Sequence, residues 1–378
     1  MMKGWEVRKL GEIIKLEYGK PLPDAKRKKD GHYPVYGANG EKDRTDEYYF
    51  DRPSIIVGRK GSAGEINLTE KRFWPLDVTY FVVFNDKKYD LKFIYYQLSS
   101  LGLPKLAKGV KPGINRNEVY SLAIKVPPLP DQQRIAASLD EAFAAIAQAK
   151  DNVEKNLFNS RDLFDSYLQN VFADTSGWET KRLVEIVDFK GGGTPSKARP
   201  EFWIGNIPWV SPKDMKAEEI YDSLDHISPA ALWNSSTTLI PQGSVLIVVR
   251  SGILARTVPI AIAMRNVTIN QDMKALIPHK CIVSKFLYYI LVANQNKLLA
   301  KANRGATVHR LPSENLENLW ISFPLLSKQK DLVAKLDALS AETKKLEAIY
   351  QKQLAELEDL KKSILDKAFR GELTGGES

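Results

Sequence analysis

The sequence predicts an α+β protein with two pseudo-symmetric globular α/β domains joined by two long antiparallel coiled-coil helices. Three observations lead to this prediction: the chain of 378 residues repeats itself, each copy begins with short apolar runs, and each ends in a 42-residue stretch without Gly or Pro. A length near 150 residues per domain fits two or three domains, each with its own core. The expected parts are a domain at 1–130, a helix at 131–173, a domain at 174–326, and a helix with a C-terminal tail at 327–378.

The internal repeat is strongest at the end of each copy. Between 122–172 and 319–369, at a constant offset of 197, 16 of 51 positions are identical. Only roughly 3 matches would be expected by chance. The start of each copy also matches, because Trp5-Glu6 recurs as Trp178-Glu179 at an offset of 173. We infer a duplication in which the second copy gained 24 residues before its constant tail.

Each globular domain is expected to be rich in strands and to hold one amphipathic helix. Short apolar runs bounded by Gly and Pro predict strands. These runs are 55–57, 78–84, 245–249 and 319–323. The amphipathic helices are expected around 92–100 and 284–301. Proline-containing stretches at 126–130 and 323–326 close the two domains, since proline ends a strand and suits the first turn of a helix.

The two stretches without Gly or Pro predict helices long enough to pair with each other. In the second, a 4-3 spacing from Leu332 to Lys367 selects eleven positions, eight of them apolar, which is typical of a coiled-coil seam. A helix of this length spans about 63 Å, more than the width of a domain of about 130 residues. We therefore prefer pairing between the helices to packing of each helix on its own domain. Antiparallel pairing would place one domain at each end, related by a pseudo-two-fold axis.

The net charge of +9 is unevenly distributed. The two globular segments carry +8 (1–130) and +4 (174–326), whereas the first helix carries −3 and the last segment is neutral. A polyanion such as a nucleic acid would therefore bind to the globular domains and not to the helices.

Composition excludes several classes of protein. An apolar fraction of 43% with 10% aromatic residues is too high for a disordered chain. No apolar run approaches the roughly 18 residues of a spanning helix, and the N-terminus lacks the apolar core of a signal peptide, so we expect a cytoplasmic protein. A single cysteine, Cys281, excludes an internal disulfide framework and a cysteine-built zinc site.

Motifs for catalysis are sparse. The run from Phe189 to Gly193 is similar to the Phe-x-Gly-x-Gly loop of S-adenosylmethionine-dependent methyltransferases, but the Asn/Asp-Pro-Pro-aromatic motif of those enzymes is missing. Asp188-Phe189-Lys190 fits the Asp-x-Lys pattern of metal-dependent nucleases, which is too short to be specific. The chain has no ATP-binding phosphate loop and no nucleophile elbow. We predict no catalytic residue, cofactor or metal site. A free-standing methyltransferase or nuclease and a coiled-coil protein adaptor stay as alternatives.

Basic and amide side chains in the matched loops are candidates for nucleic-acid contacts, because Arg bonds guanine, Asn suits adenine and Lys contacts phosphate. Arg59 and Arg250, which the repeat pairs with each other, are favoured because each follows an apolar strand and precedes a glycine turn. The candidates in the first domain are Lys20, Asn39, Arg59, Lys60, Lys108, Lys111, Asn115 and Arg116. Those in the second are Lys197, Lys213, Arg250, Arg256, Asn303, Arg304, His309 and Arg310. Four tyrosines are instead expected in the core: Tyr95, Tyr96, Tyr288 and Tyr289.

Several motifs together resemble those of the specificity subunits of type I restriction–modification systems, over essentially the whole chain. They are the Trp-Glu-x-x-x-Leu start of each half, the segment 33–40, the turn 192–196, the stretch 127–135 and the closing segment 368–373. The last two are the most specific.

This resemblance implies two target-recognition domains, each reading one half of a bipartite, asymmetric sequence in double-stranded DNA. It implies that the helices hold these domains apart and dock methyltransferase subunits, and that a restriction nuclease–translocase subunit joins the complex. S-adenosylmethionine, ATP and magnesium would belong to those partners. The chain itself would be a non-catalytic reader of DNA sequence.

Overall fold

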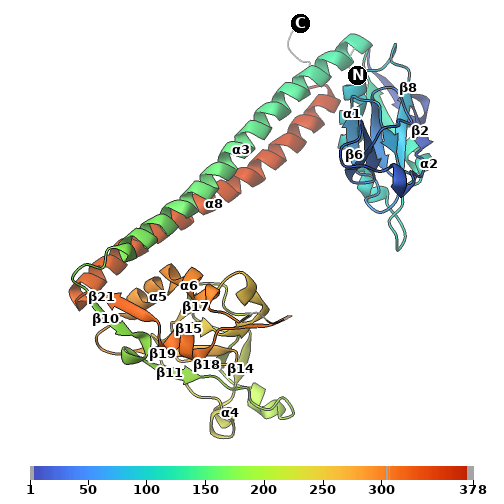
Figure 1. Cartoon of the computed structure of the whole chain (residues 1–378). Helices are drawn as coiled ribbons and strands as arrows, with labels where there is room; N and C mark the ends of the chain where they lie inside the picture. Colours follow the sequence, from blue (N-terminus) through green and yellow to red (C-terminus); the bar gives the residue numbers. More distant parts are fainter. Residues whose placement is uncertain (1–3, 304, 306, 373–378) are drawn as a thin grey trace. The chain divides into compact units, whose positions relative to one another are not determined.

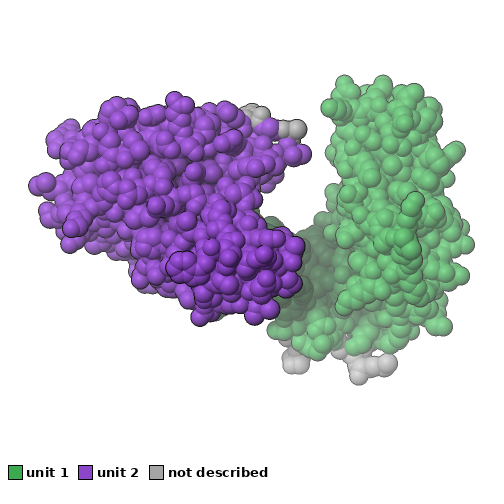
Figure 2. Space-filling view, turned by 90° about the horizontal axis from the view of Figure 1, so that it is seen from below, with its two compact units in different colours: residues 1–155, 350–378 green, residues 156–349 purple. Residues whose placement is uncertain are grey.

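The computed structural model describes residues 4–303, 305 and 307–372. The chain forms two compact units, shown in separate colours in Figure 2: unit 1 comprises 1–155 with 350–378, and unit 2 comprises 156–349. We call the part of unit 1 before the first long helix module 1, and the part of unit 2 between the two long helices module 2. Each long helix contributes to both units.

Module 1 consists of two small sheets, a two-stranded ribbon and two helices. Its strands are β1 (Glu6–Lys9), β2 (Ile14–Tyr18), β3 (Tyr33–Gly37), β4 (Gly40–Thr45), β5 (Ser54–Gly58), β6 (Ile66–Thr69), β7 (Trp74–Pro75), β8 (Thr79–Phe84) and β9 (Ala123–Val126). The sheets have the orders β2-β8-β5-β6 and β4-β3-β7, and β1 pairs with β9. Helix α1 (Leu91–Ser100) starts at Asp90, whose carboxylate accepts a hydrogen bond from the Phe93 amide at 2.8 Å. A shorter helix, α2 (Arg116–Ser121), precedes β9.

Module 2 has the same kinds of element and more of them. Its strands are β10 (Glu179–Arg182), β11 (Val187–Gly191), β12 (Ile207–Val210), β13 (Glu219–Ile220), β14 (Asp225–Ile227), β15 (Val245–Val248), β16 (Arg250–Ser251), β17 (Ile260–Ala263), β18 (Thr268–Ile269), β19 (Met273–Pro278), β20 (His309–Arg310) and β21 (Trp320–Phe323). Its helices are α4 (Pro229–Trp233), α5 (Ser284–Ala293), α6 (Gln295–Ala300) and α7 (Ser313–Glu317).

The two modules repeat one strand order, which confirms the duplication predicted from the sequence. The order β2-β8-β5-β6 recurs as β11-β19-β15-β17, with β13 added at the edge. The order β4-β3-β7 recurs as β14-β12-β18, and in both sheets the central strand is antiparallel to one neighbour and parallel to the other.

The predicted strands exist, and their continuous apolar character has a structural cause. All five residues of β5 are buried, because Ile55 and Val57 face one apolar cluster and Ile56 faces another with Phe73 and Phe81. A strand covered on both faces reads as an unbroken apolar run.

The predicted helix 284–301 is wrong in one respect, since it is divided into α5 and α6. The Asn294 side chain donates to the Ile290 carbonyl at 2.8 Å and so competes with the helical backbone at the division.

The long helices are α3 (Leu129–Ala173) and α8 (Leu326–Arg370), which lie side by side (Figure 1). In unit 1, Lys150 pairs with Glu358 at 2.8 Å, and Lys361 lies 5.2 Å from the ring centre of Phe143. Residue numbers therefore rise on one helix as they fall on the other. In unit 2 the helices are bridged by Arg161 and Glu347 at 3.1 Å, so the predicted antiparallel pairing is confirmed.

The apolar seam predicted along α8 is only partly buried. Leu336 and Thr343 are buried, whereas Leu346 and Leu360 are 38% and 47% exposed. One neighbouring helix covers only one side of α8, which leaves the rim of a broad apolar stripe open to solvent.

A buried glutamine attaches each module to the start of the helix that follows it. The Gln132 side chain accepts from the Asp90 amide at 3.0 Å and donates to the Pro127 carbonyl at 2.8 Å. Gln329, at the offset of 197, accepts from the Val283 amide and donates to the Cys281 and Pro324 carbonyls, each at 2.9 Å. Both amides are at most 1% exposed, and buried amides need such partners.

A second anchor joins the amphipathic helix of each module to its long helix. The Tyr289 hydroxyl donates to Asp337 at 2.6 Å, and the Tyr96 hydroxyl donates to Asp140 in the same way. Burial and the neighbouring carboxylate raise the pKa of Tyr96. The predicted core location of these two tyrosines is confirmed, since Tyr96 is 8% and Tyr289 is 1% exposed. Tyr95 and Tyr288 are half-buried beside them.

Candidate nucleic-acid interface

Loop pairing brings most candidate residues of module 1 together. Lys60 and Lys108 each form a β-bridge with Gly113, and the Ile114 amide donates to the Arg59 carbonyl at 3.1 Å. The loop after β5 is thus paired with the loop before α2, which carries Lys111. Asn115 has a structural role as well, because its side chain caps α2 by accepting from the Asn117 amide at 2.9 Å.

Lys20 and Asn39 lie on the two turns that border this loop. The Lys20 amide donates to the Pro75 carbonyl at 2.8 Å. Asn39 lies in the β3–β4 turn, next to Ala38. This turn comes close to Gly58: a Cβ atom added to Gly58 would lie 2.7 Å from the Ala38 carbonyl oxygen. Only glycine permits this close approach just before Arg59. The module therefore gathers all eight predicted residues around one loop.

Arg59 is the most firmly held of these side chains. Its Nε and Nη2 atoms donate to the Asp77 carbonyl at 3.1 and 2.7 Å. Its guanidinium carbon lies 5.3 Å from the ring centre of Tyr18 and 6.0 Å from that of Tyr80, and Arg116 lies 5.3 Å from the same Tyr18 ring. Within the described part of the chain, neither arginine forms an ion pair, whereas Lys108 pairs with Glu118 at 2.6 Å.

In module 2 the corresponding loops form a short ribbon. Arg250 pairs with Arg310 across β16 and β20, His309 pairs with Ser251, and Asn303 forms a β-bridge with Arg310. The Arg250 Nε atom is 3.9 Å from an Asp272 carboxylate oxygen.

The other predicted residues of module 2 have different positions. Arg256 is exposed and follows the turn 252–255 that packs against β20. Lys213 is paired with Asp225 at 2.7 Å, and no hydrogen bond or ion pair among the described residues joins it or Lys197 to the ribbon. Arg304 lies outside the described residues.

The structure corrects one predicted equivalence between the modules. The sequence comparison pairs Arg59 with Arg250. In the structure, the Arg59 and Lys60 amides both donate to the Val78 carbonyl, as the Val249 and Arg250 amides do to the Asp272 carbonyl. The equivalent of Arg250 is therefore Lys60, and Val249 takes the place of Arg59.

This correction has a simple cause. Runs of Ile, Val and Leu align equally well in two registers, and a shift of one residue reverses the face of every side chain in a strand. Backbone pairing decides between the registers: Lys60 pairs with Gly113 where Arg250 pairs with Arg310.

The glycine turns after β2 and β11 are equivalent. A Cβ atom added to Gly19 would lie 2.1 Å from the Leu76 carbonyl oxygen, and one added to Gly192 would lie 2.0 Å from that of Asn270. Gly192 therefore lies in a tight backbone turn directly after β11.

The sequence matches the family model described as type I restriction modification DNA specificity domain, over residues 2–155 and 175–358. This chain belongs to that family. Over 265 residues it is 36% identical to the EcoR124I/EcoR124II specificity subunit of Escherichia coli, and the match spans 67% of this chain and 64% of the length of that relative.

Two solved structures share the fold of this chain. A chain from a structure described as the basis of complex assembly and conformational transition of the type I R-M system has a TM-score of 0.78 at 21% identity, with 98% of both chains covered. The HsdS subunit from Thermoanaerobacter tengcongensis has a TM-score of 0.60 at 21% identity, again with 98% of both covered.

The sequence analysis missed Tyr18 and Tyr80 as parts of the candidate interface. Their rings are 5.1 Å apart, and Tyr18 is 46% exposed although it ends a strand. The available signal was weak: Tyr18 precedes the first glycine turn, where the second copy has Gly191.

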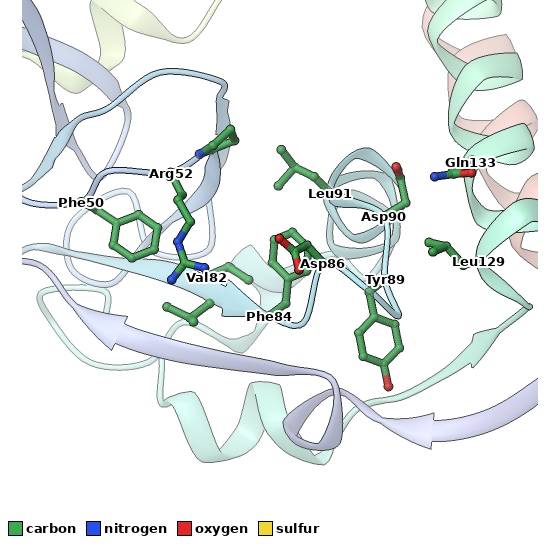
Figure 3. Close-up of a pocket in the computed structure, with 12 residues that line it drawn as sticks. Phe50, Arg52, Val82, Phe84, Asp86, Tyr89, Asp90, Leu91, Leu129 and Gln133 are labelled. Carbon is green, nitrogen blue, oxygen red and sulfur yellow. The ribbon is translucent and has the colours of Figure 1, made fainter.

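A separate apolar hollow of about 260 Å³ lies at the far end of β8 from Arg59. Figure 3 shows Arg52 beside Phe50 on one side and Leu129 and Gln133 of α3 on the other.

Among the described residues, no three His, Cys, Asp or Glu side chains are grouped so that they could hold a metal ion. Over the same residues, no helix is both long and apolar enough to span a bilayer.

Proposed function

We propose that this chain is the non-catalytic DNA-reading subunit of a type I restriction–modification complex. Each module would read one half of a bipartite, asymmetric sequence in double-stranded DNA. Family membership supports this proposal, and one structural observation carries it: both modules present a cation at the same position of the same paired loops, Lys60 in module 1 and Arg250 in module 2.

The charges of these loops favour a polyanionic ligand. Lys60, Arg250 and Arg310 are exposed, and within the described residues Lys60 and Arg310 form no ion pair. Uncompensated cations on exposed loops attract phosphates, and each phosphate contact releases counterions from DNA.

The helices suit protein partners better than DNA. They carry exposed large apolar side chains in unit 2, where Phe158 is 68%, Leu163 57% and Ile349 49% exposed. Such residues are typical of protein interfaces. We propose that methyltransferase subunits dock on the helices and that a restriction nuclease–translocase subunit joins them. S-adenosylmethionine, ATP and magnesium would bind to those partners, and the assembly would act on DNA in the cytoplasm.

Salt dependence tests the proposal. With six to ten phosphate contacts, affinity for a target duplex should fall by roughly 10³- to 10⁵-fold between 50 and 200 mM salt. Lys60→Ala and Arg250→Ala should each reduce the slope of log affinity against log salt by about 1. Lys87→Ala and Lys280→Ala are matched controls, because both exposed lysines follow the far ends of β8 and β19.

Two results would contradict the proposal. Affinity that hardly changes with salt would exclude a phosphate-based interface. Methyl transfer or cleavage by the purified chain alone, with labelled S-adenosylmethionine and magnesium, would favour the enzyme alternative.

A further inference from the structure

We propose that Arg59 is the residue with which module 1 reads a guanine, that Tyr18 is its positioning residue, and that module 2 has no equivalent contact. This inference rests on the proposed DNA-reading function and adds the base class and the half-site to it.

One edge of the Arg59 guanidinium is already occupied. Nε and Nη2 both donate to the Asp77 carbonyl oxygen, at 3.1 and 2.7 Å. Because a guanidinium has five N–H donors in one plane, this leaves both Nη1 hydrogens and one Nη2 hydrogen free of that bond. The free terminal edge has the two parallel donors that bond guanine O6 and N7 together. An anchored side chain also loses little conformational entropy when it binds.

The tyrosine rings hold the guanidinium by its face and not by its edge. Arg59 lies over Tyr18 and Tyr80, at 5.3 and 6.0 Å. Contact with a ring face stabilises a cation while its in-plane hydrogens stay available. A carboxylate partner would instead occupy the donors that a base needs.

Arg116 adds a second cation to this cluster. It lies 5.3 Å from the same Tyr18 ring. Within the described residues, neither Arg59 nor Arg116 has a carboxylate within ion-pair distance, so two like charges share one ring. Their repulsion would be relieved by an electron-rich ligand such as a guanine edge with its phosphate. A surface hollow of about 510 Å³, lined by Tyr18, Tyr80 and Arg116 among others, is open at this place.

Module 2 lacks this cluster at all four equivalent positions. Strand pairing places Gly191 opposite Lys274 where Tyr18 is opposite Tyr80. The position of Arg59 is taken by the buried Val249, and that of Arg116 by Ser313, the first residue of α7. Only Lys274 is cationic, and lysine serves mainly as a phosphate contact. Guanine reading by this cluster therefore belongs to one half-site alone, which contributes to an asymmetric target.

Selection from a randomised duplex pool tests the inference. The full chain, with the subunits that co-purify with it, should enrich a two-part sequence in which one half contains a required G·C pair. In Arg59→Lys, preference for that pair should fall by about 5- to 150-fold, the equivalent of the 1–3 kcal/mol of a bidentate contact. Arg59→Gln should shift the preference toward adenine, and the other half should not change. Lys87→Ala is the control, since this exposed lysine follows the far end of β8 and the change should leave the G·C pair required.

Variants of Tyr18 separate positioning from folding. Tyr18→Phe keeps the ring and should keep the guanine preference, whereas Tyr18→Gly, which copies module 2, should reduce it at the same base pair only. The inference is wrong if Arg59→Lys still requires the G·C pair, or if it weakens binding equally for all sequences. If the wild-type chain enriches no two-part sequence, the proposed function fails together with the inference.

Discussion

Replacement of Gln329 by Met should release module 2 from helix α8. Met has a similar volume and a similar helix propensity, so the change removes hydrogen bonds and little else. Gln329 is fully buried and bonds the Val283 amide and the Cys281 and Pro324 carbonyls, each at 2.9 Å. At roughly 1 kcal/mol for each bond, and more where a backbone group stays unpaired, the loss should be about 3 kcal/mol.

Hydrogen exchange is the suitable assay for Gln329→Met, because the chain has two units and global unfolding need not be two-state. Protection should fall by about two orders of magnitude in α5 and β21, while α1 and β9 in unit 1 keep theirs. Gln132→Met is the matched variant and should show the reverse pattern. If exchange in α5 changed less than threefold, or equally in both units, the glutamine would not be the anchor that the contacts indicate.

Two further predictions concern the turn after β11 and the first long helix. Gly192→Ala should destabilise unit 2 by about 2 kcal/mol or more in thermal unfolding, because its Cβ atom would lie 2.0 Å from the Asn270 carbonyl oxygen. The neighbouring Gly191→Ala, whose Cβ would meet only the end of Lys274 at 3.6 Å, should be tolerated, and equal losses would contradict the steric argument. For Asp140, burial by itself would raise the pKa, but the ion pair with Lys92 and the Tyr96 hydrogen bond hold it below its usual value. Its stabilising contribution should therefore be complete above the unfolded pKa of about 3.9 and be lost as the pH falls through the lower folded pKa. The free energy of unfolding, measured with urea, should fall less on acidification for Asp140→Asn than for the wild type. An equal pH dependence of the two proteins would refute this.

The duplication, the long helices and their pairing could be predicted from the sequence because their signals are local or periodic. A constant offset and an apolar 4-3 spacing can be counted along the chain, and a helix without Gly or Pro needs no distant partner to be recognised. The same holds for the buried tyrosines of α1 and α5, which lie on the apolar faces of amphipathic helices.

The composition of the candidate interface was decided only by the tertiary structure. Tyr18, Arg59 and Arg116 are far apart in the sequence. They meet because β2 and β5 both pair with β8, and the loop before α2 pairs with the loop after β5. The register that makes Lys60, and not Arg59, the equivalent of Arg250 likewise depends on backbone hydrogen bonds. Ile, Val and Leu fill a buried strand equally well in either register, so side-chain type alone does not specify which residue reaches the surface.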